Sequence, residues 1–434
     1  MTEFDLAPLD ETERSLRDAA HRFARDLIRP AAAELDRMPP QQRVGPDSPY
    51  FRVLRAFKEQ GFHRIGMPAG GSGDEEPPST LARCLIYEEL GWGSLGLGTA
   101  LGVDGLPFAL AAMLGDGRVQ EELVRPWLED TEGRYHGCWG VTEPDHGSDY
   151  LLFAREPDIA GFGRGNVQAV RDGDGWRVSG QKAAWVSSAP VATHCALHAQ
   201  VRGSEDLAHG VLLIVPLDSR GVSRGPVMDM LGVRDDPQGE LFFDDVRVPG
   251  HYALVPDSDL YRPFMDQLLC LTSVGLGAMC VGMARAAWEE ALAYAQQRVQ
   301  GGVPLTHHKN IRLKLYAMFE KVETARAYVR AAMAHVHGSL FERRSFDASP
   351  PHARAAQIHA KRVAFEVAHE AVQVFGASGL VGDSLVQKLF RDARCALIED
   401  GTLEVLALDA VNDLVGDLAP RRGAAGAQAA AGRP

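Results

Sequence analysis

The spacing of apolar residues changes twice along the chain, and these changes limit the folds that it can adopt. Over residues 10–35 apolar side chains recur at the three- to four-residue spacing of an amphipathic helix, and this spacing continues to about residue 128. After Tyr135 it gives way to short β-prone runs bounded by Gly, Asp and Pro, such as residues 211–215. Helical spacing returns near Tyr261. The sequence therefore predicts helices, then a β domain, then helices again.

This order indicates an α+β multidomain protein, and a chain of 434 residues is long enough for about two or three domains. We expect an N-terminal α-helical domain over residues 1–135 and a middle antiparallel β-barrel or sandwich domain over residues 136–255. A C-terminal α-helical bundle is expected over residues 256–418. Residues 419–434 are rich in Ala and Gly and lack apolar periodicity, which predicts a disordered tail.

Composition argues against several kinds of partner and site. The formal net charge is −13 and no cluster of Lys and Arg is present, so we expect no nucleic-acid partner. The six cysteines lack the CxxC spacing of a zinc site, so no metal is expected. Their sparse distribution and the acidic first residues, which do not resemble a signal peptide, favour a cytoplasmic protein. The most apolar long segment, residues 264–295, carries charged side chains, so no membrane span is expected.

Two adjacent carboxylates near the end of the chain are candidates for catalysis. Glu399 and Asp400 close an apolar helical run and stand directly before Gly401 and Thr402. Glycine allows the backbone to approach a ligand closely, so a carboxylate at this place can act as a general base. Acidic residues before Gly are also common at ordinary helix ends. This stretch alone leaves both interpretations open.

Five motifs follow one another in an order that resembles the acyl-CoA dehydrogenase superfamily of flavoproteins. They are similar to that superfamily's TEPxxGSD, GxKxWITN, FxxVxVP, QxxGGxG and RDARxxxIxEGT segments. In this chain they read VTEPDHGSD from Val141, GQKAAWVSS from Gly180, FDDVRVP from Phe243, QVFGASG from Gln373 and RDARCALIEDGT from Arg391. Each motif is weak alone, but together they span roughly residues 10–415 in the family's order.

The resemblance implies FAD, bound between the β domain and the C-terminal helices, often with a neighbouring subunit of a homotetramer or homodimer completing the site. A flat apolar flavin ring needs an aromatic wall, which Trp185 can supply, and a few polar groups. Arg298 matches the arginine that reaches the FAD diphosphate from another subunit, although Gly301 stands where most relatives carry Phe. The implied cofactor-binding residues are Trp139, Val141, Thr142, Gly147, Ser148, Trp185, Ser187, Arg298, Gln373, Gly376 and Thr402.

The resemblance also implies α,β-dehydrogenation of an acyl thioester, carried by CoA or by a carrier protein. In such enzymes a carboxylate removes the α-proton while the β-hydride passes to flavin N5, and the electrons then pass to an electron-transfer flavoprotein. Asp400 stands at the position of the family's catalytic Glu, and Glu399 stands where many members have Tyr. Because Asp is one methylene shorter than Glu, the backbone or the substrate must lie closer. Glu399 and Asp266 are back-up candidates for the base.

Two other functions stay open. Some relatives with Asp at the position of Asp400 are nitroalkane oxidases, which use oxygen, and residues 277–292 resemble that branch; residues 406–408, however, lack the arginine that follows the oxidases' base. A further branch takes its base from the long helix after the barrel, where Asp266 is the back-up and Gln267 stands at the expected place. Because the usual Glu is missing, a catalytically silent subunit of a hetero-oligomer is the third interpretation.

Overall fold

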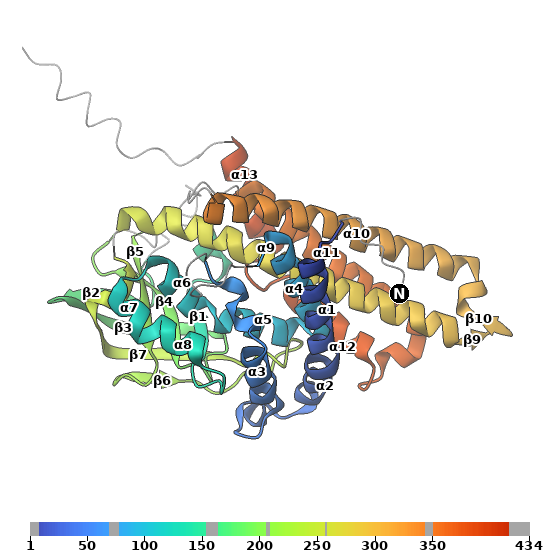
Figure 1. The fold of residues 1–434 in the computed structure, drawn as a ribbon, viewed down its shortest axis with the longest axis horizontal. Helices are drawn as coiled ribbons and strands as arrows, with labels where there is room; N and C mark the ends of the chain where they lie inside the picture. The colour runs from blue at the N-terminus through green and yellow to red at the C-terminus, as the bar shows by residue number, and fades with distance from the viewer. Residues whose placement is uncertain are drawn as a thin grey trace, which may run out of the picture.

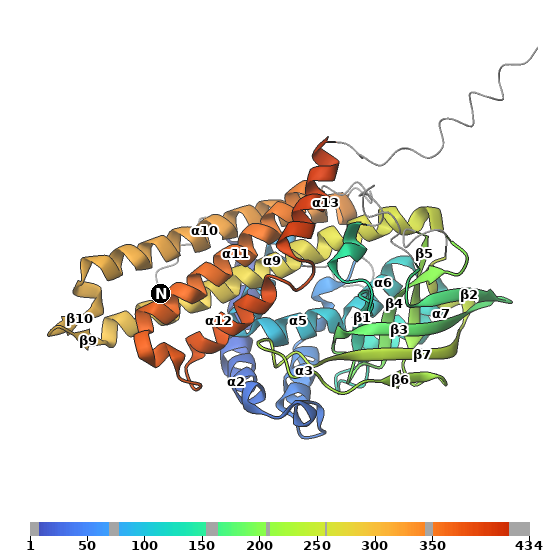
Figure 2. The same ribbon diagram turned by 180° about the vertical axis from the view of Figure 1, so that it is seen from behind.

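A computed structural model describes residues 8–68, 78–152, 164–204, 209–256, 258–342 and 350–415, so the predicted tail over residues 419–434 lies outside the described residues. The predicted order of helices, β-sheet and helices is confirmed. In both views the strands of the large sheet gather at one end of the molecule, and the long C-terminal helices run from that end to the opposite one (Figures 1 and 2).

The N-terminal part is a set of helices whose starts follow from the sequence. Asp10 caps α1 through a reciprocal capping box, in which Glu13 N donates to Asp10 Oδ1 over 2.8 Å. Ser79 caps α4 by accepting from Ala82 N over 3.0 Å. The α-helices here are α1 (Glu11–Phe23), α2 (Arg29–Arg37), α3 (Pro49–Glu59), α4 (Thr80–Gly93), α5 (Leu95–Asp104), α6 (Leu106–Leu114), α7 (Gly117–Val119) and α8 (Arg125–Glu129).

The middle part is an eight-stranded sheet with the order β6-β7-β3-β2-β4-β5-β8, and β1 pairs with β4. Its strands are β1 (Gly137–Gly140), β2 (Gln168–Asp172), β3 (Gly175–Ser187), β4 (His194–Val201), β5 (Gly210–Pro216), β6 (Val222–Arg224), β7 (Gln238–Val248) and β8 (Ala253–Val255). Most neighbours are antiparallel, as expected, but β1 and β2 each pair with β4 in parallel. Parallel pairing requires a long connection, and β3 lies in the chain between these strands and β4.

The C-terminal part is built on one long helix, α9 (Ser258–Gln297), against which α4, α10 and α11 pack. The hairpin of β9 (Val299–Gln300) and β10 (Val303–Pro304) joins α9 to α10 at the end away from the sheet (Figure 1). A Cβ at Gly282 would lie 1.8 Å from Glu88 O, so α4 and α9 can pack this closely only because this residue is Gly. The remaining helices are α10 (Lys309–His337), α11 (Pro350–Phe375), α12 (Leu385–Ala396) and α13 (Leu403–Val415).

Two described segments, Leu95–Leu114 and Leu260–Gln297, are long and apolar enough to cross a membrane by length and composition alone. Their most apolar windows are 50% and 83% buried inside the protein. In this fold, the second of them is the core helix of the C-terminal part.

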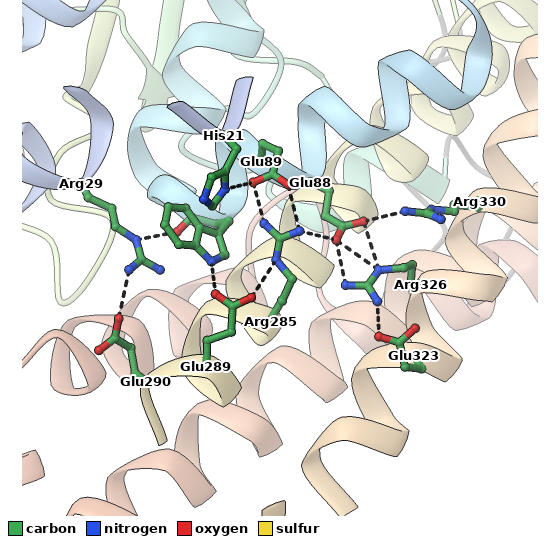
Figure 3. Close-up of polar contacts among 11 residues, drawn as sticks. His21, Arg29, Glu88, Glu89, Arg285, Glu289, Glu290, Glu323, Arg326 and Arg330 are labelled. Atoms are coloured by element: carbon green, nitrogen blue, oxygen red, sulfur yellow. Dashed lines mark hydrogen bonds and ion pairs between the residues drawn. The ribbon is translucent and has the colours of Figure 1, made fainter. Parts of the chain in front are cut away.

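A buried ion-pair network fixes α4 between α9 and α10 (Figure 3). Glu88 of α4 lies 3.1 Å from Arg285 of α9, and 2.9 Å and 3.4 Å from Arg326 and Arg330 of α10. Glu89 also pairs with Arg285, over 2.6 Å. Burial alone would raise the pKa of Glu88, but the three arginines lower it to about 2.

Replacing Glu88 by Gln is expected to destabilise the protein, because the neighbouring arginines lose the carboxylate that neutralises them. Removing one partner of a buried ion pair typically costs about 3–5 kcal/mol. The folded-state pKa of Glu88 lies below its ordinary value of 4.5, so its stabilisation is present above that pH and is lost as the pH falls towards 2. Thermal unfolding between pH 3 and 7 should therefore show the largest gap between wild type and Glu88→Gln at neutral pH.

The matched control is Glu121→Gln, which breaks an exposed pair with Arg125 at 2.5 Å. Exposed pairs are worth about 0–1 kcal/mol, so this variant should unfold within a degree or two of wild type. Equal losses in the two variants would contradict a structural role for the buried network.

Candidate active site

A cavity of about 730 Å³ lies where the sheet meets α5, α9 and the turn between α12 and α13. Its wall includes most of the residues predicted to bind the cofactor, namely Trp139, Val141, Thr142, Gly147, Ser148, Trp185 and Ser187. Glu399 and Asp400 line the same cavity. The fold thus brings the motif residues of the β domain and the two carboxylates near the end of the chain to one mainly apolar cavity.

The turn that carries the carboxylates has an unusual backbone conformation that α11 supports. Asp400 has a φ of 53° and Gly401 a φ of 96°, both in the left-handed region, which Asp tolerates better than most residues. The buried ammonium of Lys361 donates to the carbonyl oxygen of Glu399 over 2.5 Å and to that of Gly401 over 3.0 Å. One side chain therefore binds the backbone on both sides of Asp400.

Hydrogen bonds from two helices orient the Asp400 carboxylate. Thr272 Oγ1 on α9 donates to Asp400 Oδ2 over 3.2 Å, and Gln357 Nε2 on α11 donates to the same oxygen over 3.3 Å. Gln357 Nε2 also lies 3.3 Å from the Asp400 carbonyl oxygen. Donors on two separate helices hold the carboxyl group in one orientation. Asp400 is therefore a positioned carboxylate at the cavity wall.

The same turn is tied to the first motif. Thr402 N donates to Ser148 Oγ over 3.0 Å, across 254 positions of sequence. Thr402 itself does not line the cavity, but this bond places Ser148 beside the carboxylate turn. The contact joins the sheet domain to the C-terminal helices at the site.

Two buried residues, His198 and Tyr261, fix the position of Trp139 in the cavity wall. Trp139 Nε1 donates to His198 Nε2 over 2.8 Å, and the Tyr261 hydroxyl lies 3.0 Å from His198 Nδ1. Burial lowers the pKa of His198 well below its usual value, and the nearby ammonium of Lys182 adds to this effect. The imidazole is therefore neutral, and its Nε2 can accept the indole N–H.

The segment after β1 is bonded to β3. Lys182 Nζ donates to the Val141 carbonyl oxygen over 2.8 Å and pairs with Glu143 over 2.6 Å. Ala183 N donates to the Thr142 carbonyl oxygen over 3.0 Å. These bonds hold the backbone of Val141 and Thr142 at the cavity wall.

The structure adds a buried carboxyl that the motifs did not indicate. Ser187 Oγ donates to Asp236 Oδ2 over 2.7 Å, and Gln238 Nε2 donates to the same oxygen over 3.1 Å. Burial raises the pKa of Asp236 to about 7. The acidic doublet Asp235-Asp236 in a β-rich region is the local signal that could have pointed to it.

The two adjacent carboxyls of the turn lie in different surroundings. Burial raises the pKa of Glu399 to about 8, and the nearby carboxyl of Asp236 adds to the shift. Glu399 Oε2 is buried and has no hydrogen-bond partner within the described part of the chain. Glu399 is thus mostly protonated at neutral pH, whereas Asp400 receives two hydrogen-bond donors.

Other predicted residues do not line the cavity. Gln373 and Gly376 are exposed, and so is Arg298, which follows α9 beside the β9–β10 hairpin, at the end opposite the sheet (Figure 1). Their assignment to FAD, which for Arg298 involves another subunit, stays a prediction. Asp266 lies outside the cavity wall and pairs with Arg262 over 3.1 Å.

Three family models match the chain in order. The model of the acyl-CoA dehydrogenase N-terminal domain matches residues 10–129, that of the middle domain residues 138–246 and that of the C-terminal domain residues 264–414. A benzylmalonyl-CoA dehydrogenase from Aromatoleum aromaticum is 30% identical, over 94% of this chain and 98% of that protein.

Two further comparisons agree with this result. The mitochondrial short-chain specific acyl-CoA dehydrogenase of Rattus norvegicus is 27% identical, over 94% of this chain and 91% of that protein. A structure of the flavoprotein nitroalkane oxidase superposes with a TM-score of 0.83 at 19% identity, over 95% of this chain and 98% of that one, which shows a shared fold.

The raised pKa of Glu399 predicts a measurable effect of pH on stability. Because its folded-state pKa lies above the ordinary value of 4.5, its stabilisation is fully present below that pH and is lost as the pH rises through about 8. Thermal unfolding between pH 5 and 9 should show wild type losing stability, and Glu399→Gln losing less. Glu404→Gln, which alters an exposed carboxyl nearby, should keep the wild-type slope. Parallel curves for wild type and Glu399→Gln would show that Glu399 is ionised throughout.

Proposed function

Because this chain belongs to the acyl-CoA dehydrogenase family, we propose that it is an FAD-dependent oxidoreductase that dehydrogenates an acyl thioester at its α and β carbons, with Asp400 as the base. The observation that carries the proposal is the position of Asp400. It faces the same cavity as the residues predicted to contact the flavin, and two helices donate hydrogen bonds to it.

The residues of the cavity wall fit a flavin. Trp185 is 56% exposed although it lines the cavity, so much of its ring surface is open for a flat apolar partner. The hydroxyl-bearing residues Thr142, Ser148 and Ser187 line the same space. No other atom lies within 4 Å of the position that a Cβ of residue 147 would take, so a ligand has room to approach the backbone of Gly147. When bound there, FAD would supply the hydride acceptor.

The chain's own residues prepare proton removal. Thr272 and Gln357 both donate to Asp400 Oδ2, and among the described residues no group donates to Oδ1. Oδ1 is therefore the oxygen that can take the α-proton. The backbone at Asp400 is left-handed, and two hydrogen bonds from Lys361 fix its position. A fixed backbone sets the direction of the side chain, and in our proposal this offsets the shorter reach of Asp relative to Glu.

Exposed apolar side chains at the cavity favour a protein as the electron acceptor. Trp185 and Leu231 both line the cavity and are 56% and 62% exposed. An electron-transfer flavoprotein that covers them would approach the flavin closely. The second candidate function is a nitroalkane-oxidase-like reaction, in which molecular oxygen accepts the electrons. The Asp at position 400 favours this function, and the shared fold is consistent with it.

Replacing Asp400 by Asn should abolish reduction of the bound flavin by substrate. Loss of a general base lowers rates by roughly 10²–10⁴-fold. The measurement is anaerobic mixing of the holoenzyme with a panel of acyl-CoAs and nitroalkanes, followed at the flavin absorbance band. Asp266→Asn is the matched control and should reduce at close to the wild-type rate, since Asp266 lies outside the cavity wall.

The outcomes separate the candidate functions. Bleaching by thioesters in wild type but not in Asp400→Asn supports the dehydrogenase. Bleaching by nitroalkanes alone, with peroxide formed in air, supports the oxidase. If no compound bleaches the bound flavin, the chain is a catalytically silent subunit, and if only Asp266→Asn loses activity, the base assignment is wrong.

Thr272→Val is expected to slow flavin reduction about tenfold, because it removes one hydrogen bond to the carboxylate while keeping the shape of the side chain. Hydrogen bonds to charged groups are worth about 1.5–3 kcal/mol. Thr272→Ser, which keeps the hydroxyl, should restore most of the rate. Equal rates in the Val and Ser variants would mean that Thr272 does not position the base.

A further inference from the structure

Three buried side-chain oxygens in or beside the cavity wall lack a hydrogen-bond partner among the described residues. They are Thr99 Oγ1, Asp236 Oδ1 and Glu399 Oε2, and each of these atoms is buried. Thr99 and Glu399 line the cavity, and Asp236 is bonded to Ser187 and Gln238, which also line it. Buried polar atoms without partners are rare in native proteins, so a group of them at a cavity indicates a missing ligand group.

These oxygens come from three separate elements and meet around Glu399. Thr99 lies on α5, Asp236 lies in the segment before β7, and Glu399 lies in the turn after α12. Asp236 raises the pKa of the Glu399 carboxyl, and the nearby Thr99 hydroxyl lowers it. The other charged groups that face it are Lys361 from α11, which favours its ionised form, and its neighbour Asp400, which opposes it.

Buried carboxyls outnumber buried cations on this side of the cavity. Lys388 is shared by Asp235 at 2.9 Å and Asp392 at 2.5 Å. Lys361 donates to two backbone carbonyls. The carboxyls are Asp235, Asp236, Asp392, Glu399 and Asp400, and the cations are Lys361 and Lys388. Arg394 also lines the cavity, but it is exposed to solvent. Glu399 and part of Asp236 are therefore protonated at neutral pH, and a cationic ligand group would favour their ionised forms.

We propose that Thr99, Asp236 and Glu399 bind an ammonium group on the acyl part of the substrate, so that the enzyme acts on thioesters of amino-substituted acids. An ammonium has three N–H donors and no acceptor, which matches three unpartnered oxygens. This inference rests on the proposed function, because it concerns the substrate of the same cavity.

Glu399 and Asp400 line the same cavity, so the ammonium and the carbons that react would occupy one space. A divalent metal is the other common ligand of carboxylates, but within the described residues no group of three or more His, Cys, Asp or Glu side chains could hold one.

The first test compares substrates that differ only in the ammonium group. The pairs are 3-aminobutyryl-CoA with 3-methylbutyryl-CoA, and 6-aminohexanoyl-CoA with heptanoyl-CoA, in which a methyl group replaces the ammonium. In anaerobic flavin reduction, at least one amino thioester should exceed its methyl counterpart about 100-fold or more in kcat/KM, because a site built for hydrogen bonds rejects an analogue that lacks them. Glu399→Gln should lose most of this preference.

Glu404→Gln is the matched control for that variant and should keep the preference, since Glu404 is exposed and lies outside the cavity wall. Reduction by the methyl thioesters as fast as by the amino ones in every pair would overturn this inference and leave the proposed function standing. If no thioester reduces the flavin, the proposed function fails and this inference fails with it.

The second test does not depend on turnover. Asp400→Asn, loaded with FAD, is titrated with 3-aminobutyryl-CoA in two buffers of different ionisation enthalpy at pH 7, using calorimetry. A bound ammonium should ionise the Glu399 carboxyl and release most of one proton from it, in addition to the smaller share that Asp236 releases. The double variant with Glu399→Gln should release only the share of Asp236. The methyl thioester should release no proton from either variant. Equal proton release in the single and double variants would contradict the proposal.

Discussion

The geometry of this site depends on one buried ammonium. Lys361 donates to the carbonyl oxygens of Glu399 and Gly401, and so fixes the turn that presents Asp400 in a left-handed conformation. A buried lysine is costly unless it is compensated, and burial lowers the pKa of Lys361 while the nearby Asp400 carboxylate opposes this. Two interactions offset this cost: the ammonium donates to two backbone carbonyls, and it lies near the negative charge of Asp400.

The helices around this turn are joined by further buried charges. Arg354 on α11 pairs with Asp409 on α13 over 2.8 Å and donates to the Leu269 carbonyl oxygen on α9 over 2.9 Å. These bonds connect the helices that carry Gln357 and Thr272, the two donors to Asp400. Such networks need every member to be paired. The helices that carry the two donors to Asp400 are thus fixed to one another by bonds within the protein.

The sequence predicted the order of the domains and much of the cavity wall, because periodicity and short motifs are local properties. Trp139, Trp185 and Asp400 meet at one cavity as the resemblance implied, although their roles stay predictions. Thr272, Gln357 and Lys361 lie inside long helices, where no local pattern sets them apart, and only tertiary packing brings them to the turn. The parallel pairing of β1 and β2 with β4 also depends on long-range contacts. Arg298 lies outside the cavity wall, so its predicted contact with FAD would have to be made at the site of a neighbouring subunit.

Glu399 and Asp400 illustrate how surroundings can divide roles between two adjacent carboxyls. Asp400 accepts hydrogen bonds from Thr272 and Gln357, which hold its carboxyl group in one orientation at the cavity wall. Glu399 lies against Thr99 and Asp236, where burial raises its pKa to about 8 and Oε2 has no donor among the described residues. Adjacent carboxyls in such different surroundings can take distinct roles. The Asp at the position of the family's usual Glu is therefore best understood together with its neighbour. In our proposal Asp400 takes the α-proton, and Glu399, which lines the same cavity, binds the ammonium group of the substrate.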